Sequence, residues 1–197
     1  MGKRAFDVVL AGLGLLVLAP VLLLVAVWIK LDSPGPVLFR QERIGRFGRP
    51  FLIHKFRSMR VENAGAQITV GADPRITRAG QFIRAAKLDE LPQLWDVLRG
   101  AMSFVGPRPE VARYVALYPA ELRELVLSVR PGITDPASLR FRNESELLAR
   151  ATDPEREYVE VVMPAKLQLT AEYVRGASLA GDLKLIARTF GLLLGLG

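Results

Sequence analysis

The feature that most constrains this chain is a stretch of 22 residues without a charged side chain, from Val8 to Ile29. As an α-helix this stretch would be about 33 Å long, close to the ~30 Å thickness of the hydrocarbon core of a bilayer. Pro20 lies in its middle, where a proline removes an intrahelical hydrogen bond and kinks or breaks the helix. The sequence therefore predicts a membrane segment that is interrupted at Pro20.

Basic residues stand on both sides of this segment, with Lys3 and Arg4 before it and Lys30 after it. Because short basic flanks tend to stay in the cytoplasm, a single span would place one flank on the unfavourable side. A re-entrant helix-break-helix, which enters the membrane and returns to the same face, satisfies both the charges and the proline. The alternatives are an ordinary span with a tolerated proline and a signal peptide, although the apolar stretch exceeds the length of a signal-peptide core.

The charge balance narrows the class of partner. The chain has 27 Lys and Arg against 20 Asp and Glu, a net charge of +7, and most of the excess lies between Arg40 and Arg60. A basic cluster directly after a membrane segment favours anionic lipid or phosphorylated substrates. No nucleic-acid-binding motif accompanies it, so nucleic acid is not an expected partner. With no cysteine and His54 as the only histidine, a zinc site and Ser-His-Asp chemistry are not expected either.

The rest of the chain predicts a mainly helical α+β fold. Two short apolar runs around a turn at 45–50 predict a small β-hairpin, and the polar, glycine-containing residues 64–80 predict a surface loop. Helical spacing follows, and the expected helix boundaries are a stop at Gly100 and starts at Pro119, Asp153 and Ser178. We expect residues 1–31 to form a membrane anchor and residues 32–197 one cytosolic catalytic domain, with helices lying on the membrane face.

Two adjacent carboxylates, Asp89 and Glu90, stand just before Pro92, which is expected near the first position of a helix. The positive end of the helix dipole favours ionised carboxylates and phosphates at this place. Neighbouring helical residues point about 100° apart, so the two acids would divide their roles. One would attack a phosphorus as nucleophile, and the other would bind a divalent metal or position the substrate. The alternative is that both only cap the helix.

Arg108 stands between Pro107 and Pro109, which restrict the backbone on both sides of it. A rigidly held guanidinium suits bidentate contact with phosphate oxygens, and Arg130-Pro131 offers a similar turn. The alternative in each case is a turn with a solvated arginine.

The apolar segment with its central proline and the motifs HKFRSM, LDELPQLWDVLRG, MSFVGPRPE and RPGIT resemble the bacterial sugar transferases called monotopic phosphoglycosyl transferases. The likeness covers nearly the whole chain. It implies transfer of a sugar-1-phosphate from a UDP-sugar to a polyprenyl (undecaprenyl) phosphate, with release of UMP, at the cytoplasmic face of the bacterial inner membrane. It also implies Mg²⁺, a covalent phosphosugar on the aspartate of the acid pair, and a place at the start of glycoconjugate assembly.

By motif, the resemblance makes Asp89 the nucleophile and Glu90 its partner, with both acids as candidate metal ligands. The expected phosphate-binding residues are Lys55, Arg57, Arg84, Arg108 and Arg130. Asp135-Pro136 departs from the family pattern at a place where the family is expected to contact the nucleoside. The sequence does not identify the sugar. It does not determine the oligomeric state either, and an oligomer is compatible with it. The rival from another class is a non-enzymatic membrane adaptor that binds anionic lipid or protein through its basic hairpin and does not need Asp89, Glu90 and Arg108 to meet.

Overall fold

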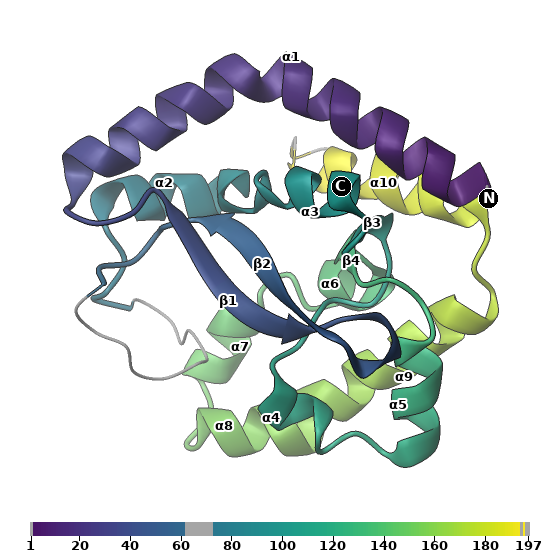
Figure 1. Cartoon of the computed structure of the whole chain (residues 1–197). Coiled ribbons are helices and arrows are strands. Elements are labelled where there is room, and N and C mark those ends of the chain that lie inside the picture. The colour runs from purple at the N-terminus through teal and green to yellow at the C-terminus, as the bar shows by residue number, and fades with distance from the viewer. Residues whose placement is uncertain (1, 62–72, 194, 196–197) are drawn as a thin grey trace.

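The computed structural model describes residues 2–61, 73–193 and 195. As predicted, the described chain is mainly helical with a small amount of β-structure (Figure 1). The helices are α1 (Gly2–Asp32), α2 (Arg78–Ala85), α3 (Gln93–Arg99), α4 (Ala112–Val115), α5 (Ala120–Leu127), α6 (Pro136–Arg140), α7 (Glu144–Ala149), α8 (Pro154–Glu157), α9 (Met163–Arg175) and α10 (Leu179–Leu193). The strands are β1 (Leu38–Ile44), β2 (Pro50–Phe56), β3 (Ser103–Val105) and β4 (Gly132–Thr134), and the short 3₁₀ and π turns are η1 (Arg46–Gly48), η2 (Leu88–Glu90) and η3 (Tyr158–Val162).

Helix α1 is the one helix of the described residues that is long and apolar enough to cross a membrane by length and composition. Its helical assignment runs through Pro20 without the predicted break. One missing N–H removes a single hydrogen bond and bends the axis, and the turns on either side remain helical. Figure 1 accordingly shows α1 bowed into an arch over the rest of the molecule. The re-entrant arrangement itself stays a prediction.

The underside of α1 packs on the remainder of the chain through small and apolar residues. Ala11 is fully buried in a cluster with Ile53, Val97 and Met102. A Cβ atom on Gly14 would lie 3.3 Å from the Cδ1 atom of Leu94, so this glycine lets α1 approach α3 closely. The arch is therefore attached along its concave side to α3 and β2.

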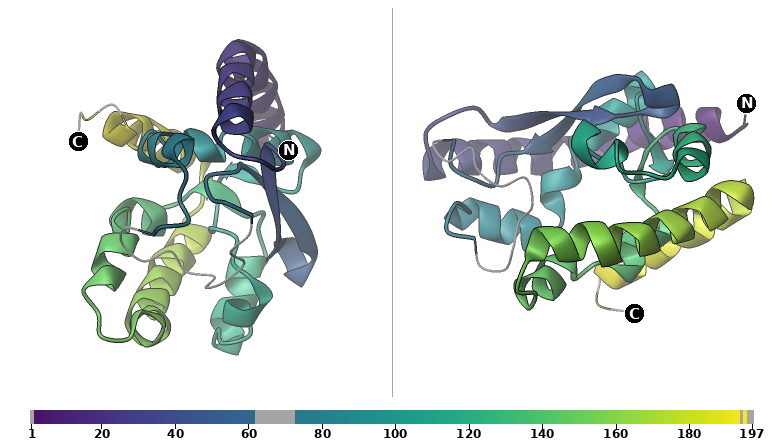
Figure 2. Two further views of the ribbon diagram at one scale, coloured as in Figure 1. Left: turned by 90° about the vertical axis from the view of Figure 1, so that its left-hand side faces the viewer. Right: turned by 90° about the horizontal axis from the view of Figure 1, so that it is seen from below.

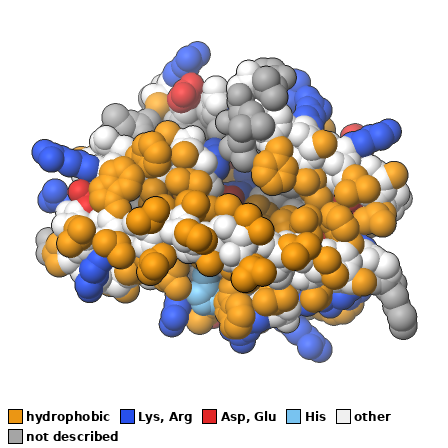
Figure 3. All heavy atoms as spheres, turned by 90° about the horizontal axis from the view of Figure 1, so that it is seen from above, with side chains coloured by type: hydrophobic (Ala, Val, Ile, Leu, Met, Phe, Trp, Pro, Cys, Tyr) orange, Lys and Arg blue, Asp and Glu red, His pale blue; other side chains and the backbone are white. Residues whose placement is uncertain are grey.

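The outer face of α1 is covered by apolar side chains that are exposed. Figure 3, which looks down on α1, shows hydrophobic side chains gathered across this face and Lys and Arg side chains at its margins. The exposed apolar residues of α1 include Val9, Leu13, Leu16, Val17, Leu23, Leu24, Val27 and Leu31. Trp28 on α1 also contacts Phe82 on α2, with ring centroids 5.3 Å apart, and both rings remain partly exposed. Such a surface is typical of contact with lipid or protein.

Strands β1 and β2 form the predicted antiparallel hairpin, with Arg40 opposite His54. The turn at 45–50 closes through Phe47 and Gly48, both with positive φ. The hairpin lies below α1 and beside α3 (Figure 1). Its second strand therefore reaches the segment that carries the two predicted catalytic acids.

A second pair of strands, β3 and β4, is parallel and was not predicted from the sequence. The two strands approach so closely that a Cβ atom on Gly132 would lie 2.1 Å from the backbone nitrogen of Gly106. This contact fixes the start of the loop that carries Arg108, two residues after Gly106.

Helices α5 to α9 form a layer on the side of the hairpin away from α1, as the two views of Figure 2 also show. Its core joins side chains from α4 to α9, and its buried members are Val111, Tyr114, Val126, Leu148, Tyr158, Val162, Met163 and Leu167. The predicted helix boundaries are confirmed at Gly100, whose φ is 87°, and at Asp153 and Ser178, whose side chains accept hydrogen bonds from the next helical turn.

The predicted loop at 64–80 is only partly tested, because residues 62–72 lie outside the described part of the chain. Its last residues, 78–80, belong to α2, so the expected end of the loop is wrong. Thr77 caps this helix by accepting a hydrogen bond from the Gly80 backbone at 3.0 Å. A polar cap before a short helix reads as loop in the sequence, which explains the error. The division at residue 31 into anchor and catalytic domain stays a prediction.

Candidate active site

The two acids lie in the 3₁₀ turn η2, which leads into α3 through Leu91 and Pro92. Leu91 and Pro92 both have right-handed helical dihedral angles, so the chain runs from η2 to α3 in nearly continuous helical form. Lys87 precedes η2 in the left-handed conformation, with a φ of 55°. This turn separates η2 from α2 and directs Asp89 and Glu90 toward the hairpin.

Glu90 is held by two cations from distant parts of the sequence. The Lys55 Nζ atom, on β2, lies 2.7 Å from Oε1 of Glu90, and the Arg108 Nη2 atom lies 2.5 Å from the same oxygen. A second Arg108 nitrogen lies 3.4 Å from Oε2. Burial alone would raise the pKa of Glu90, but Arg108 and Lys55 outweigh burial and hold this pKa well below its usual range. Glu90 is therefore ionised, and both of its carboxylate oxygens contact cationic side chains.

Asp89 has the opposite environment. Its Oδ1 atom is buried and has no hydrogen-bond partner among the described residues. Burial, and then repulsion from Glu90, raise the pKa of Asp89, while Lys55 and Arg84 attract its charge. An oxygen of this kind is available to a ligand, and an acid with a raised pKa is a typical feature of functional sites.

Gln93 is a site residue that the sequence analysis did not single out. It stands four residues after Asp89, on the same helical face, and its side chain is 1% exposed. Its Nε2 atom has no partner among the described residues. Asp89 and Gln93 thus each contribute a buried polar atom without a partner to the start of α3. The sequence signal was weak because a glutamine in the first turn of a helix is usually solvated.

The remaining predicted phosphate-binding arginines are placed differently from one another. Arg84, in the last turn of α2, acts on Asp89 through its charge. Arg57 is 4% exposed and donates to the backbone oxygens of Ser33 and Pro34, both at 2.7 Å, just after α1. Arg130 donates to the Gly100 carbonyl at 2.8 Å, at the far end of α3. The structure thus brings Lys55, Arg84 and Arg108 to the acid pair and leaves Arg57 and Arg130 elsewhere, and all five phosphate roles stay predictions.

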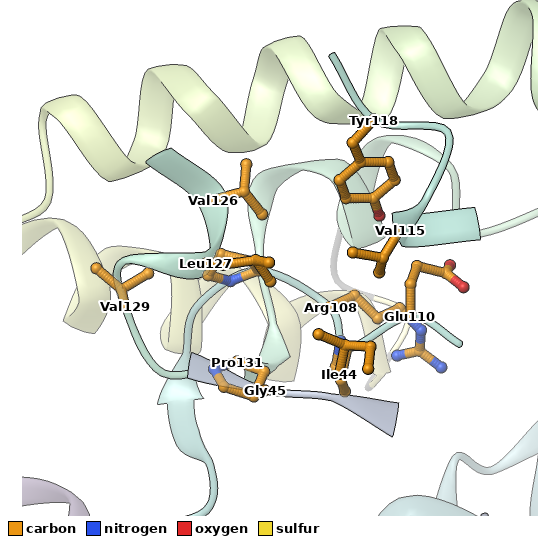
Figure 4. Close-up of a pocket in the computed structure, with 12 residues that line it drawn as sticks. Ile44, Gly45, Arg108, Glu110, Val115, Tyr118, Val126, Leu127, Val129 and Pro131 are labelled. Atoms are coloured by element: carbon orange, nitrogen blue, oxygen red, sulfur yellow. The ribbon is translucent and has the colours of Figure 1, made fainter. Parts of the chain in front are cut away.

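The loop after β3 also presents Glu110, which the sequence analysis left without a role. The Tyr158 hydroxyl donates to it at 2.6 Å, and Arg43 of β1 approaches it at 3.5 Å. Burial, and then Glu110, raise the pKa of Tyr158. Figure 4 shows Arg108 and Glu110 beside a depression that is otherwise lined mainly by apolar side chains of β1, α4 and α5. Glu110 therefore connects the Arg108 loop to the hairpin through Arg43 and to the π turn η3 through Tyr158.

Asp89, Glu90 and Arg108 thus lie together, next to the helix that packs under the apolar arch. The contact between Glu90 and Arg108 favours the enzyme hypothesis, because the adaptor hypothesis does not need it. The site combines one carboxylate with a buried oxygen that has no partner, one carboxylate bound by cations, and an arginine on a restrained loop. Such a constellation suits nucleophilic attack on a phosphorus atom that carries negative oxygens.

Comparison with known proteins identifies the family of the chain. The family described as bacterial sugar transferase matches residues 1–195 of the chain. The chain therefore belongs to the bacterial sugar transferase family, as its motifs suggest.

Individual relatives carry more specific names. A UDP-glucose:undecaprenyl-phosphate glucose-1-phosphate transferase of Escherichia coli is 40% identical over 95% of this chain and 39% of its own length. A Caulobacter vibrioides protein of the same name is 41% identical over 98% of this chain and 69% of its own length. An Aeromonas hydrophila UDP-N-acetylgalactosamine-undecaprenyl-phosphate N-acetylgalactosaminephosphotransferase is 45% identical over 67% of this chain and 32% of its own length. The chain thus spans about two fifths of the Escherichia coli relative and about two thirds of the Caulobacter one.

Proposed function

We propose that this chain transfers a sugar-1-phosphate from a UDP-sugar to undecaprenyl phosphate and releases UMP, as the first step of glycoconjugate assembly. The names of its relatives support both substrate classes. The observation that carries the proposal is the contrast within the acid pair, where Glu90 is bound by Lys55 and Arg108 while the neighbouring Asp89 has a buried oxygen without a partner.

In the first step, an oxygen of the Asp89 carboxylate attacks the phosphorus that bears the sugar. A phosphorus–oxygen bond to Asp89 forms, the bond to the bridging oxygen breaks, and UMP leaves with that electron pair. In the second step, a phosphate oxygen of the lipid attacks the same phosphorus and displaces the Asp89 carboxylate. The product is a polyprenyl diphosphate sugar, and the enzyme is regenerated.

The geometry favours Asp89 over Glu90 as the nucleophile. Both oxygens of Glu90 are engaged by cations, and its lowered pKa makes it a weak base. The raised pKa of Asp89 makes its carboxylate the more basic of the two and hence the better nucleophile. Lys55 and Arg108 would neutralise the charge of the transferring phosphoryl group, sharing their donors between Glu90 and the substrate.

The residues present fit a magnesium ion only in part. Mg²⁺ typically binds one or two carboxylates together with substrate phosphates, and no group of three or more acidic, histidine or cysteine side chains that could hold a metal exists among the described residues. The unpartnered oxygen of Asp89 suits such an ion, whereas Glu90 would first have to release Lys55 or Arg108. When bound, the ion would offset the negative charge of the diphosphate.

We further propose that α1 is re-entrant and that the catalytic part lies on the cytoplasmic face of the bacterial inner membrane. The support is that the described globular part holds both ends of α1. At its start, Arg4 donates to the Val97 and Leu98 carbonyls of α3 at 2.6 and 2.8 Å. At its end, the Asp32 carboxylate accepts from the Ala79 backbone of α2 at 3.0 Å. A straight span across a bilayer would separate these ends by the thickness of the membrane.

Intact-mass measurement tests the proposed chemistry. Wild-type protein mixed with Mg²⁺ and each of a panel of UDP-sugars, without lipid, should gain the mass of one phosphosugar, and proteolysis should map it to Asp89. Asp89→Asn should form no adduct and lose nearly all UMP release in the presence of undecaprenyl phosphate. Asp153→Asn is the matched control, because this exposed helix cap is remote from the site and asparagine caps equally well. An adduct that persists in Asp89→Asn, or that maps to Glu90, would contradict the assignment.

A further inference from the structure

A second acid on α3, Asp96, makes a close pair with the only histidine of the chain. The backbone N–H of His54 donates to Asp96 Oδ2 at 2.9 Å, and the ring Nδ1 atom lies 2.6 Å from Oδ1. The Asp96 side chain is 2% exposed and that of His54 is 12% exposed. We assign the ring proton to Nδ1, so that both oxygens of Asp96 accept hydrogen bonds from His54. One strand residue thus binds both oxygens of one buried carboxylate.

The pair lies next to the contacts that hold the catalytic acids. The residue after His54 on β2 is Lys55, which binds Glu90 at 2.7 Å, and the residue before it, Ile53, packs against Val97. Three consecutive strand residues therefore contact the same η2–α3 segment. Asp96 follows Glu90 by six residues, about 9 Å along a helix. Strand β2 therefore contacts the η2–α3 segment at two separate points, Glu90 and Asp96.

Asp96 also connects the acid pair to the Arg108 loop. Its backbone carbonyl accepts from the Ala101 and Met102 backbones at 3.0 and 3.1 Å, which ends α3 and begins the chain toward β3. Strand β3 leads directly to the loop that presents Arg108 to Glu90. Asp96 lies between Glu90 and Arg108 in the chain, and its side chain bonds this segment to the hairpin through His54.

We infer that His54 and Asp96 are positioning residues, which fix β2 against α3 and so set Lys55 and Arg108 at the distances from Glu90 that phosphoryl transfer needs. The inference rests on the proposed function for its effect on turnover. The atom that acts is Nδ1, which donates to Asp96 and has no part in the chemistry. Without this contact Lys55 can still pair with Glu90, but β2 is no longer fixed against α3 at Asp96, so the distance between Lys55 and Glu90 can change.

Two substitutions separate the role of Nδ1 from the bulk of the ring. The amide nitrogen of an asparagine occupies nearly the position of the histidine Nδ1 atom, whereas that of a glutamine reaches the position of Nε2. We expect His54→Asn to keep turnover within about threefold of wild type and His54→Gln to lower it at least tenfold. In a Lys55→Ala background, His54→Gln should add little further loss, because its effect passes through Lys55. If the loss of turnover in the double variant equals the product of the two single losses, the effect of His54→Gln does not pass through Lys55, and the inference is contradicted.

Chemical labelling of Lys55 gives a readout that does not depend on activity. With a lysine-acylating reagent, the rate at Lys55 relative to the exposed Lys184 should rise at least threefold in His54→Gln and stay near the wild-type value in His54→Asn. Equal turnover and equal labelling in the two variants would overturn the inference. If His54→Gln does not fold, Asp96→Asn, which keeps a single acceptor oxygen, should show the same two effects, and wild-type values in that variant would overturn the inference as well.

The turnover and labelling measurements also distinguish a failure of this inference from a failure of the proposed function. A wild-type protein that releases no UMP with any UDP-sugar would defeat the proposed function, and the labelling of Lys55 would still decide the role of the pair. An active wild-type protein with indistinguishable His54→Asn and His54→Gln variants would defeat the inference alone.

Discussion

Asp89 and Glu90 are neighbours in the sequence, yet their surroundings act on them in opposite directions. The lowered pKa of Glu90 means that its ionised form stabilises the folded state above the unfolded pKa of about 4.3, and that this contribution is lost as the pH falls. The raised pKa of Asp89 means that its charge costs stability, and that this cost appears as the pH rises above about 3.9. The residue that we propose as the nucleophile thus carries a charge at the expense of stability.

We therefore predict opposite stability effects for two matched substitutions. Asp89→Asn should raise the free energy of unfolding at pH 7 by about 1 kcal/mol, because it removes a buried charge beside Glu90. Glu90→Gln should lower it by about 2 kcal/mol, because it leaves Lys55 and Arg108 without their counterion. Thermal unfolding in detergent checks both. Since the cost of Asp89 grows with pH, the gain from Asp89→Asn should be smaller at pH 4.5 than at pH 7, and a gain that is larger at pH 4.5 would contradict this account.

At the scale of elements, the site depends on how closely β3 and β4 approach each other. The Gly106 backbone donates to Thr134 at 3.1 Å, and the Gly132 backbone donates to Pro107 at 2.9 Å, so the loop that holds Arg108 is bonded to β4 on both sides of the crossing. Backbone atoms occupy the space where a Cβ atom on either glycine would lie. Because the atoms in the way belong to the backbone, no change of side-chain rotamer can make room for a Cβ atom. A side chain added at either glycine must therefore move the loop.

We predict that Gly132→Ala moves the Arg108 loop and lowers both stability and turnover. The added Cβ atom would lie 2.5 Å from the Gly106 carbonyl oxygen as well as close to its nitrogen, and overpacking of this kind costs about 1–3 kcal/mol. Turnover should fall at least tenfold. Gly191→Ala in α10 is the matched control, because nothing lies within 4 Å of its Cβ position and alanine favours a helix. Wild-type turnover in Gly132→Ala would show that the crossing does not position Arg108.

At the scale of the whole molecule, α1 arches over the described globular part and is fixed to it at each end. The start of α1 is held by an ion pair between Lys3 and Asp182 of α10, and by the Asp7 carboxylate, which accepts from the Phe104 backbone at 3.2 Å. The end of α1 is held by Arg57 through the carbonyl that follows it at Ser33. The outer face of the arch presents exposed apolar side chains between Val9 and Leu31, which fits insertion from one side of a membrane (Figure 3).

We predict that both ends of α1 face the cytoplasm. The chain has no cysteine, so single cysteines can be introduced at Gly2, at the exposed Glu124 and at Leu16 near the top of the arch. A membrane-impermeant maleimide should label the first two only in inside-out vesicles. The cysteine at position 16 should resist labelling from either side until detergent is added. Labelling of position 2 from the periplasmic side would contradict the re-entrant arrangement.

Much of the local structure could be predicted from the sequence because local chemistry determines it. The hairpin around 45–50, the stop at Gly100 and the cap at Asp153 follow from turn and capping preferences that act over a few residues. The acid pair stood out because Pro92 indicates a helix start just after it, and Arg108 stood out because Pro107 and Pro109 restrict its backbone. The end of the loop before α2 was misjudged, because its polar cap and short helix carry little apolar periodicity.

The sequence by itself determined the long apolar helix, the class of the fold, the family and the residues of the acid pair. Only the tertiary structure decided that Glu90 is bound by Lys55 and Arg108, that Arg57 holds the end of α1, and that Asp96 binds His54. The physical reason is the range of the interactions. Capping, turn formation and hydrophobic periodicity act between near neighbours, whereas the partner of a buried charge is set by how strands and helices far apart in the chain pack together.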